Sequence, residues 1–279
     1  MVKCVSELYH RYPGSDIYVI GTGASLRVFP KSLLEGKITI GLNMAWKTVP
    51  VRYGVTIHPD LTIPEFLPDE APHPEITWLT KQAKMWDLVT PEQAKYGEEH
   101  FYFFDTQGRP NTQPPNKPSD SGRILDWVRQ PTGNKLYLWT SIAQVGVNLA
   151  ANMGAKNIIL IGCDNCALGS NNHAHQQHTR WRDATPKTRY REYYEALAEM
   201  RPALRERGVN LVSLNPFLTL ETPAQDFERL CQELDKPTYI ASHADISPKL
   251  DYYGYYKQRF DAALAHVKKQ LKQTFPRPF

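Results

Sequence analysis

The residues best suited to chemistry gather between residues 163 and 191. Cys163-Asp-Asn-Cys166 is followed by three histidines and several arginines, namely His173, His175, His178, Arg180, Arg182 and Arg189. Histidine titrates near neutral pH and can take a proton from a hydroxyl nucleophile, while arginine pairs with phosphate. We therefore interpret about 164–188 as a lid over a bound nucleotide. The three histidines and Asp164 are its catalytic candidates, and the three arginines are its candidates for binding phosphate.

Two other interpretations of this segment stay open. Cysteine and histidine at short spacings are preferred zinc ligands, but C-x-x-C followed by H-x-H-x-x-H matches no standard zinc finger. A solvated polar loop would also collect histidine and asparagine. We favour the nucleotide lid, and we assign no metal ligands.

Thr140 and Ser141 form a second candidate site, between an apolar stretch at 136–139 and an alanine-rich run that ends at Gly154. These hydroxyl residues stand where a helix N-cap belongs. A helix N-terminus presents free backbone N–H groups and the positive end of a dipole to an anion. Gly162 and Asp164 end the following strand, at the carboxyl edge where open α/β sheets bind ligands. The pattern predicts a phosphate site.

A glycine turn near the N-terminus repeats the order of strand, turn and helix. Gly21, Thr22, Gly23 and Ser25 follow the strand-like run 16–20; the glycines allow close backbone approach, and Ser25 can cap the next helix. The third glycine of the dinucleotide fingerprint is missing, and the second strand ends in Asn43 rather than an acidic residue, which disfavours NAD. Asn43, His58 and Asp60 are further nucleotide-binding candidates, although each could instead cap a turn.

A parallel sheet is needed to bring these candidates together. Strand-like runs recur at 17–20, 38–42, 53–57, 76–79, 101–104, 136–139, 158–161 and 209–214, with helical patterns between several of them. This alternation predicts a Rossmann-like α/β fold, with a mostly parallel sheet flanked by helices. A charged pattern over 185–207 predicts a long helix ended by Gly208, and the proline-rich 105–120 predicts a surface loop. We expect a nucleotide-binding domain over 1–220 with the lid inserted, and a C-terminal helical appendage over 221–279 packed on it.

Composition narrows the class of protein. The 279 residues suffice for one large domain with an appendage, and no apolar stretch reaches the roughly 18 residues that span a membrane. The N-terminus lacks a signal-peptide core and four cysteines are too few for a disulfide framework, so we expect a cytoplasmic protein. The net charge of +4 suits an anionic small-molecule ligand and does not demand nucleic acid. A homo-oligomer stays open, because the tail 250–279 would pack on the sheet or on a partner subunit.

The order of these motifs resembles two related groups of proteins. The glycine turn, Asn43, the Thr140-Ser141 turn and the strand end at Gly162-Cys-Asp164 are similar to those of the bacterial single-domain sialyltransferases. The same positions, together with Pro59-Asp60 after the third strand, are similar to 6-hydroxymethylpterin diphosphokinase-like proteins and their flagellin-glycosylation relatives. The similarity covers about residues 16–64 and 135–216.

The first resemblance implies transfer of a sugar from a nucleotide-sugar donor to a hydroxyl acceptor without a cofactor; a glycan, a lipid and a modified nucleic acid are all open as acceptors. It implies nucleotide contacts at Gly21, Gly23, Ser25, Asn43, Thr140 and Ser141. The family's tyrosines after the Gly-x-Asp strand end have no counterpart in Asn165-Cys166, and its catalytic histidine would fall near Arg189 or Arg191. The second resemblance implies ATP and Mg²⁺, with Asp60 and Asp164 as metal-binding carboxylates. A non-catalytic nucleotide-binding protein is the third hypothesis.

Overall fold

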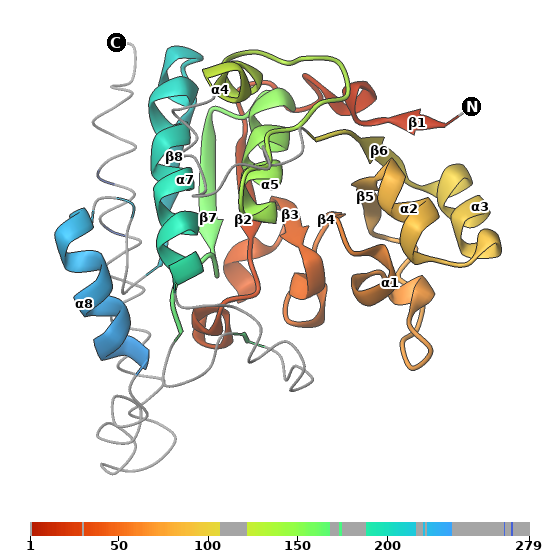
Figure 1. The fold of residues 1–279 in the computed structure, drawn as a ribbon, viewed down its shortest axis with the longest axis horizontal. Helices are drawn as coiled ribbons and strands as arrows, with labels where there is room; N and C mark the ends of the chain where they lie inside the picture. The colour runs from red at the N-terminus through yellow and green to blue at the C-terminus, as the bar shows by residue number, and fades with distance from the viewer. Residues whose placement is uncertain are drawn as a thin grey trace.

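One parallel sheet organises the part of the chain that the structure describes. The computed structural model describes residues 2–29, 31–106, 122–167, 173–174, 188–215, 220, 222–235, 265 and 269. Within these residues, eight strands form a sheet in the order β1-β6-β5-β4-β3-β2-β7-β8, and every neighbouring pair is parallel (Figure 1). The strands are β1 Lys3–Cys4, β2 Asp16–Ile20, β3 Ile38–Leu42, β4 Tyr53–Thr56, β5 Thr77–Lys81, β6 Tyr102–Phe104, β7 Asn157–Ile161 and β8 Asn210–Ser213.

Helices connect these strands, as parallel pairing requires. The α-helices are α1 Pro59–Thr62, α2 Gln82–Leu88, α3 Pro91–His100, α4 Gly122–Arg129, α5 Ile142–Asn152, α7 Thr188–Glu206 and α8 Ala224–Asp235. Short 3-10 turns occupy η1 Val5–Leu8, η2 Ala24–Val28, η3 Lys31–Leu34, η4 Asn43–Lys47 and η5 Pro64–Phe66. The predicted Rossmann-like α/β class is confirmed, and α7 ends at Glu206, two residues before the positive-φ Gly208 that its sequence pattern singled out.

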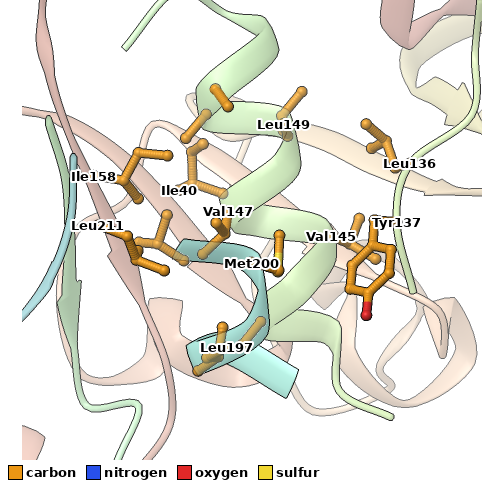
Figure 2. Packing of buried hydrophobic residues seen from close by; sticks show 14 of the residues in the cluster. Ile40, Leu136, Tyr137, Val145, Val147, Leu149, Ile158, Leu197, Met200 and Leu211 are labelled. Carbon is orange, nitrogen blue, oxygen red and sulfur yellow. The ribbon is translucent and has the colours of Figure 1, made fainter. Parts of the chain in front are cut away.

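Two helices on one face of the sheet hold the larger part of the core. In Figure 2, Val147 of α5 lies near the strand residue Ile40, Val145 lies beside Tyr137, and α7 adds Leu197 and Met200 to the same cluster. A second cluster of buried residues covers the other face, with Trp78, Met85, Ile161 and Val212 among its members. All five residues of β7 are buried because both faces of this strand are covered.

The expected strand at 136–139 is not a strand. Lys135, just before this segment, forms isolated bridges with Asp105 and Thr132, and Leu136 donates its N–H to the Asp105 carbonyl at 2.8 Å. Beyond that point the backbone N–H groups bond to side-chain amides of α5: Asn148 Oδ1 accepts from Tyr137, and Gln144 Oε1 accepts from Trp139. The apolar pattern correctly indicated a buried segment. Its backbone N–H groups, however, bond to buried side-chain amides rather than to a neighbouring strand.

The turn after β2 also differs from its expected form. The residues after Gly23 form the short 3-10 turn η2, in which Gly23 is the N-cap and makes no side-chain cap. Ser25 therefore does not cap a helix, and its side chain bonds to Asp164 instead. Thr140 and Ser141 behave as expected, since Ser141 is the N-cap of α5.

Of the expected C-terminal appendage, α8 lies within the described residues, and Phe227 packs on Tyr194 of α7 with ring centroids 4.7 Å apart. Ala265 and Lys269 are helical, and the rest of 236–279 lies outside the described residues. So do 107–121 of the proline-rich segment and, within the lid, 168–172 and 175–187. No helix in the described part of the chain is long and apolar enough to cross a membrane.

Candidate functional site

A cavity of about 500 Å³ opens at the carboxyl edge of the sheet. The chain runs from β2 to β3 on one side and from β7 to β8 on the other, so the ends of β2 and β7 form a topological switch point. Open α/β sheets bind ligands in the crevice at such a point. Its walls come from the turns after β2, β3, β4 and β7, from the N-terminus of α5 and from the first turns of α7.

Most of the sequence candidates meet in this cavity. Its lining includes Gly21, Thr22, Gly23, Asn43, His58, Thr140, Ser141, Gly162, Asp164 and His173. Ser25 lies behind the wall, and Asp60 sits on α1 outside the lining. His175, His178, Arg180 and Arg182 lie outside the described residues. Arg189 belongs to α7, but the position of its side chain is not described.

The glycine turn packs directly on the turn that follows β7. A Cβ at Gly21 would lie 2.3 Å from the carbonyl oxygen of Gly162, and one at Gly23 would lie 2.4 Å from Cγ of Asp164. Gly23 donates its N–H to the Gly162 carbonyl at 2.7 Å. Only glycine fits these two positions, because the two turns touch through their backbones. The contact brings the ends of β2 and β7 together at the floor of the cavity.

Asp164 holds the turns at this floor together through hydrogen bonds. Its side chain is 3% exposed, and Oδ2 accepts from the Ser25 N–H at 2.8 Å while Oδ1 accepts from Ser25 Oγ. The side-chain amide of Asn215 donates to the same Oδ1 at 3.3 Å. Burial raises the pKa of Asp164 to about 6, and the hydrogen bonds from Ser25 oppose the rise. Because both carboxylate oxygens are engaged within the protein, this residue is suited to holding the turns in place.

Gln144, which sequence reasoning missed, shapes the turn before α5. Its Oε1 accepts three backbone N–H groups, from Trp139 at 2.9 Å, Thr140 at 2.8 Å and Ser141 at 3.0 Å. Ser141 Oγ in return accepts from the N–H of Ala143 at 3.2 Å. The sequence does contain the pattern that predicts this role, because Ser141-x-x-Gln144 is the S-x-x-Q form of a capping box.

The hydroxyl of Thr140 stands out within this turn. Its Oγ1 atom is buried, and it has no hydrogen-bond partner among the residues that the structure describes. A buried hydroxyl without a partner costs free energy that a bound acceptor could recover. Together with the positive end of the α5 dipole, it makes this wall of the cavity favourable for an anion, although the N–H groups of Thr140, Ser141, Ala143 and Gln144 are already bonded within the turn.

His173 is held against the glycine turn. Its Nδ1 lies 2.8 Å from Thr22 Oγ1, and the N–H of the next residue, Ala174, donates to the Thr22 carbonyl at 2.8 Å. Burial lowers the pKa of His173 below its ordinary value. This lower pKa favours the neutral ring, which is the form that accepts a proton.

His58 lines the opposite side of the cavity, on a hydroxyl network after β4. Thr56 Oγ1 accepts from the His58 N–H at 2.9 Å and donates to Asn43 Oδ1 at 3.1 Å, and Thr62 Oγ1 donates to the His58 carbonyl at 2.7 Å. Asn43 takes a positive φ of 49°, which asparagine tolerates better than most residues. Burial also lowers the pKa of His58, although Asp60 opposes the change.

Two tyrosines of α7 complete the described wall, and sequence reasoning placed neither of them. Tyr190 and Tyr193 stand three residues apart, so they share one face of the helix and both line the cavity. The i, i+3 pair was visible in Tyr190-x-x-Tyr193, but nothing in the sequence showed which face of α7 would meet the cavity.

The cysteines of this region lie on two different sides. Cys166 packs in the cluster on one face of the sheet, and Cys163 packs against the cluster on the other. Burial of the thiol raises the pKa of Cys163 to about 12, with Asp164 adding to the rise, although part of the residue's surface faces the cavity. The described residues contain no group of three His, Cys, Asp or Glu side chains placed to hold a metal ion.

This arrangement offers a ligand three kinds of contact. The positive end of the α5 dipole and the hydroxyls of this turn favour an anion, two histidines whose pKa is lowered by burial can accept protons, and Leu42, Ile57 and Ile142 provide apolar surface. Neither the models of known protein families nor the curated proteins give a match to this sequence.

Proposed function

We propose that this protein is a nucleotide-dependent transferase, and specifically a glycosyltransferase that moves a sugar from a nucleotide-sugar donor to a hydroxyl acceptor. One observation carries the proposal. A single cavity at the switch point of a parallel sheet combines the capped N-terminus of α5, the buried hydroxyl of Thr140 and two histidines whose pKa is lowered by burial. In this proposal, phosphate binding and proton transfer, the two needs of the reaction, take place in this one cavity.

The size of the cavity supports a ligand of this class. About 500 Å³ lies within the range of small-molecule sites, roughly 300 to 1,000 Å³. The phosphate would lie before α5, where the hydroxyls of Thr140 and Ser141 can donate and the helix dipole favours a negative charge. Tyr190 and Tyr193 also line the cavity, and both carry phenolic hydroxyls. The resemblance to the bacterial sialyltransferases agrees with this placement of the phosphate.

The diphosphokinase alternative has less support from the geometry. It would use Asp60 and Asp164 as ligands to Mg²⁺, but both oxygens of Asp164 already accept hydrogen bonds from Ser25. Asp60 stands outside the cavity lining. A transferase that depends on histidines and hydroxyls needs neither carboxylate as a metal ligand, so it fits the described residues better.

Thermal stabilisation by nucleotides is the first test. Any ligand that binds only the folded state raises the apparent stability, by about 2.7 kcal/mol at 100 times its Kd. We would measure the Tm of the full chain with CMP, CDP, UDP, GDP and ATP, each with and without Mg²⁺. A metal-independent shift with a pyrimidine nucleotide is expected. A shift with ATP that requires Mg²⁺ would favour the diphosphokinase, and no shift with any nucleotide would contradict both.

Thr140→Val links the shift to this cavity. The variant keeps the shape of the side chain and removes a hydroxyl that has no partner among the described residues, so the stability of the free protein should change by less than about 1 kcal/mol. The shift caused by the nucleotide should fall. Thr80→Val on β5 is the matched control, because the Oγ1 atom of Thr80 is also buried without a partner among the described residues and Thr80 lies outside the cavity lining; this variant should keep the shift. An unchanged shift in Thr140→Val would place the phosphate elsewhere.

Catalysis is tested separately from binding. We expect slow hydrolysis or transfer of the nucleotide derivative that binds, with loss of turnover in His173→Gln while the thermal shift persists. Binding without any turnover in the unmodified protein would favour the non-catalytic nucleotide-binding protein.

A further inference from the structure

Two buried threonines hold the backbone of His58 at the cavity wall. Thr56 is the last residue of β4, and Thr62 is the last residue of α1. Thr56 Oγ1 accepts from the His58 N–H at 2.9 Å, and Thr62 Oγ1 donates to the His58 carbonyl at 2.7 Å. The two hydroxyl oxygens lie 2.8 Å apart. Both backbone polar groups of His58 are therefore held by one pair of buried hydroxyls.

The direction of the two bonds to His58 is fixed by chemistry. A backbone N–H can only donate and a carbonyl can only accept, so neither bond depends on the tautomer of the ring. The bonds tie His58 to the end of β4, which pairs with β3 and β5 inside the sheet. The position of His58 at the cavity is thus set by a rigid part of the fold.

Thr56 also contacts Asn43, the residue that follows β3. Its Oγ1 donates to Asn43 Oδ1 at 3.1 Å. Asn43 and His58 both line the cavity, whereas Thr56 is fully buried and lies outside the lining. One hydroxyl therefore joins two cavity-lining residues that follow neighbouring strands.

We propose that Thr56 is a positioning residue whose hydroxyl holds Asn43 and His58 in one fixed arrangement towards the bound nucleotide. This inference rests on the proposed nucleotide-dependent transfer. Thr56 would act without touching the ligand, because it is buried outside the cavity lining. Side chains that are ordered before binding lose less conformational entropy when the ligand arrives. Loss of the hydroxyl should therefore weaken nucleotide binding through Asn43 and His58.

The chain contains a matched control for the loss of this hydroxyl. Thr56→Val keeps the shape of the side chain and removes the hydroxyl, whereas Thr56→Ser keeps it. Thr39 on β3 is also buried, its Oγ1 accepts the Arg52 N–H at 2.9 Å, and it lies outside the cavity lining. Thr39→Val therefore also removes a buried hydroxyl that accepts a backbone N–H, but at a distance from Asn43 and His58 in the hydrogen-bond network. Thr56→Ala replaces Thr56→Val if the valine variant does not fold.

The first measurement needs no ligand. We would follow the imidazole C–H signal of His58 in the full chain by NMR over a range of pH, and assign it by its loss in His58→Gln. Burial lowers the pKa of His58, Asp60 opposes the change and Lys84 adds to it. In Thr56→Val the ring should lose its fixed place and become better solvated, so its pKa should rise towards the ordinary value of about 6.5.

The other variants set the limits of this test. Thr56→Ser and Thr39→Val should titrate like the unmodified protein. A His58 pKa that does not rise in Thr56→Val would overturn the inference. The other titratable side chains that line the cavity are unchanged in all of these variants; they are Cys163, Asp164, His173, Tyr190 and Tyr193.

A double-mutant cycle then tests whether Thr56 acts on the nucleotide through Asn43. Asn43→Gly removes the amide and tolerates the positive φ of this position. Thr56→Val and Asn43→Gly should each weaken binding of the stabilising nucleotide by about tenfold, and the double variant should lose much less than about a hundredfold. Thr56→Ser and Thr39→Val should keep the affinity of the unmodified protein.

Two outcomes of the cycle would overturn the inference: an unchanged affinity in Thr56→Val, or losses in Thr56→Val and Asn43→Gly that simply multiply in the double variant. Either outcome leaves the proposed function standing, because the unmodified protein still binds the nucleotide. If no nucleotide binds to the unmodified protein, the proposed function fails, while the titration of His58 still decides whether Thr56 positions this residue.

Discussion

At the scale of single residues, the clearest prediction about stability concerns Asp164. Its pKa in the folded protein is raised from 3.8 to about 6, mainly by burial. The protonated carboxyl therefore stabilises the fold relative to the charged one. This contribution is fully present below about pH 4 and is lost as the pH rises through about 6.

Asp164→Asn removes the titration and keeps a group that can hydrogen-bond to Ser25. Its free energy of unfolding should rise relative to that of the unmodified protein between pH 4 and pH 7, by up to about 3 kcal/mol. Denaturant unfolding at a series of pH values measures this difference. Asp87→Asn, at an exposed position on α2, controls for the loss of one carboxylate. A difference that stays flat with pH would show that the carboxylate is ionised without penalty.

At the scale of elements, Gln144 decides the shape of the turn before α5. Its oxygen serves three backbone N–H groups and the residue is fully buried, whereas its Nε2 has no hydrogen-bond partner within the described residues. Gln144→Met keeps the size of the side chain and leaves these donors without an acceptor. We expect a loss of stability on the order of 3 kcal/mol. Gln144→Glu keeps the acceptor and should lose less.

The chain contains a matched control for this experiment. Gln93 of α3 makes the same kind of capping box with Thr90, with a bond of 3.0 Å from the Thr90 N–H to Gln93 Oε1, but this box is exposed. Water can replace the lost acceptor there, so Gln93→Met should cost less than about 1 kcal/mol. Chemical denaturation compares the variants. Equal losses at the two sites would mean that burial of the Gln144 bonds adds nothing.

At the scale of the whole molecule, the cavity joins segments that are far apart in the chain. The turn at 21–23, the start of α5 and the residues Tyr190 and Tyr193 of α7 all line it. A nucleotide bound there should slow amide hydrogen exchange in all three segments together. The segment 77–100, which carries β5, α2 and α3, should exchange at the same rate with and without ligand. Protection confined to one segment, or found at 77–100, would contradict a shared site.

The sequence alone was enough for the class of fold. Strand-like runs separated by helical patterns predicted the parallel sheet, because burial on both faces and the helical crossovers leave strong local signals. It also identified the glycine turn, the N-cap at Ser141 and the carboxylate after β7, since capping and close backbone approach depend on a few neighbouring residues. Ten of its candidates line the cavity because parallel strands end at one edge: Gly21, Thr22, Gly23, Asn43, His58, Thr140, Ser141, Gly162, Asp164 and His173.

Only the tertiary structure decided how those residues are used. Asp164 is engaged by Ser25, His173 is held by Thr22, and 136–139 is satisfied by the amides of α5 instead of a strand. The placement of Tyr190 and Tyr193 depends on which face of α7 meets the sheet. Each of these pairings joins residues that local propensity does not connect. A hydrogen bond between Thr22 and His173, 151 positions apart, exists only because the ends of β2 and β7 pack together.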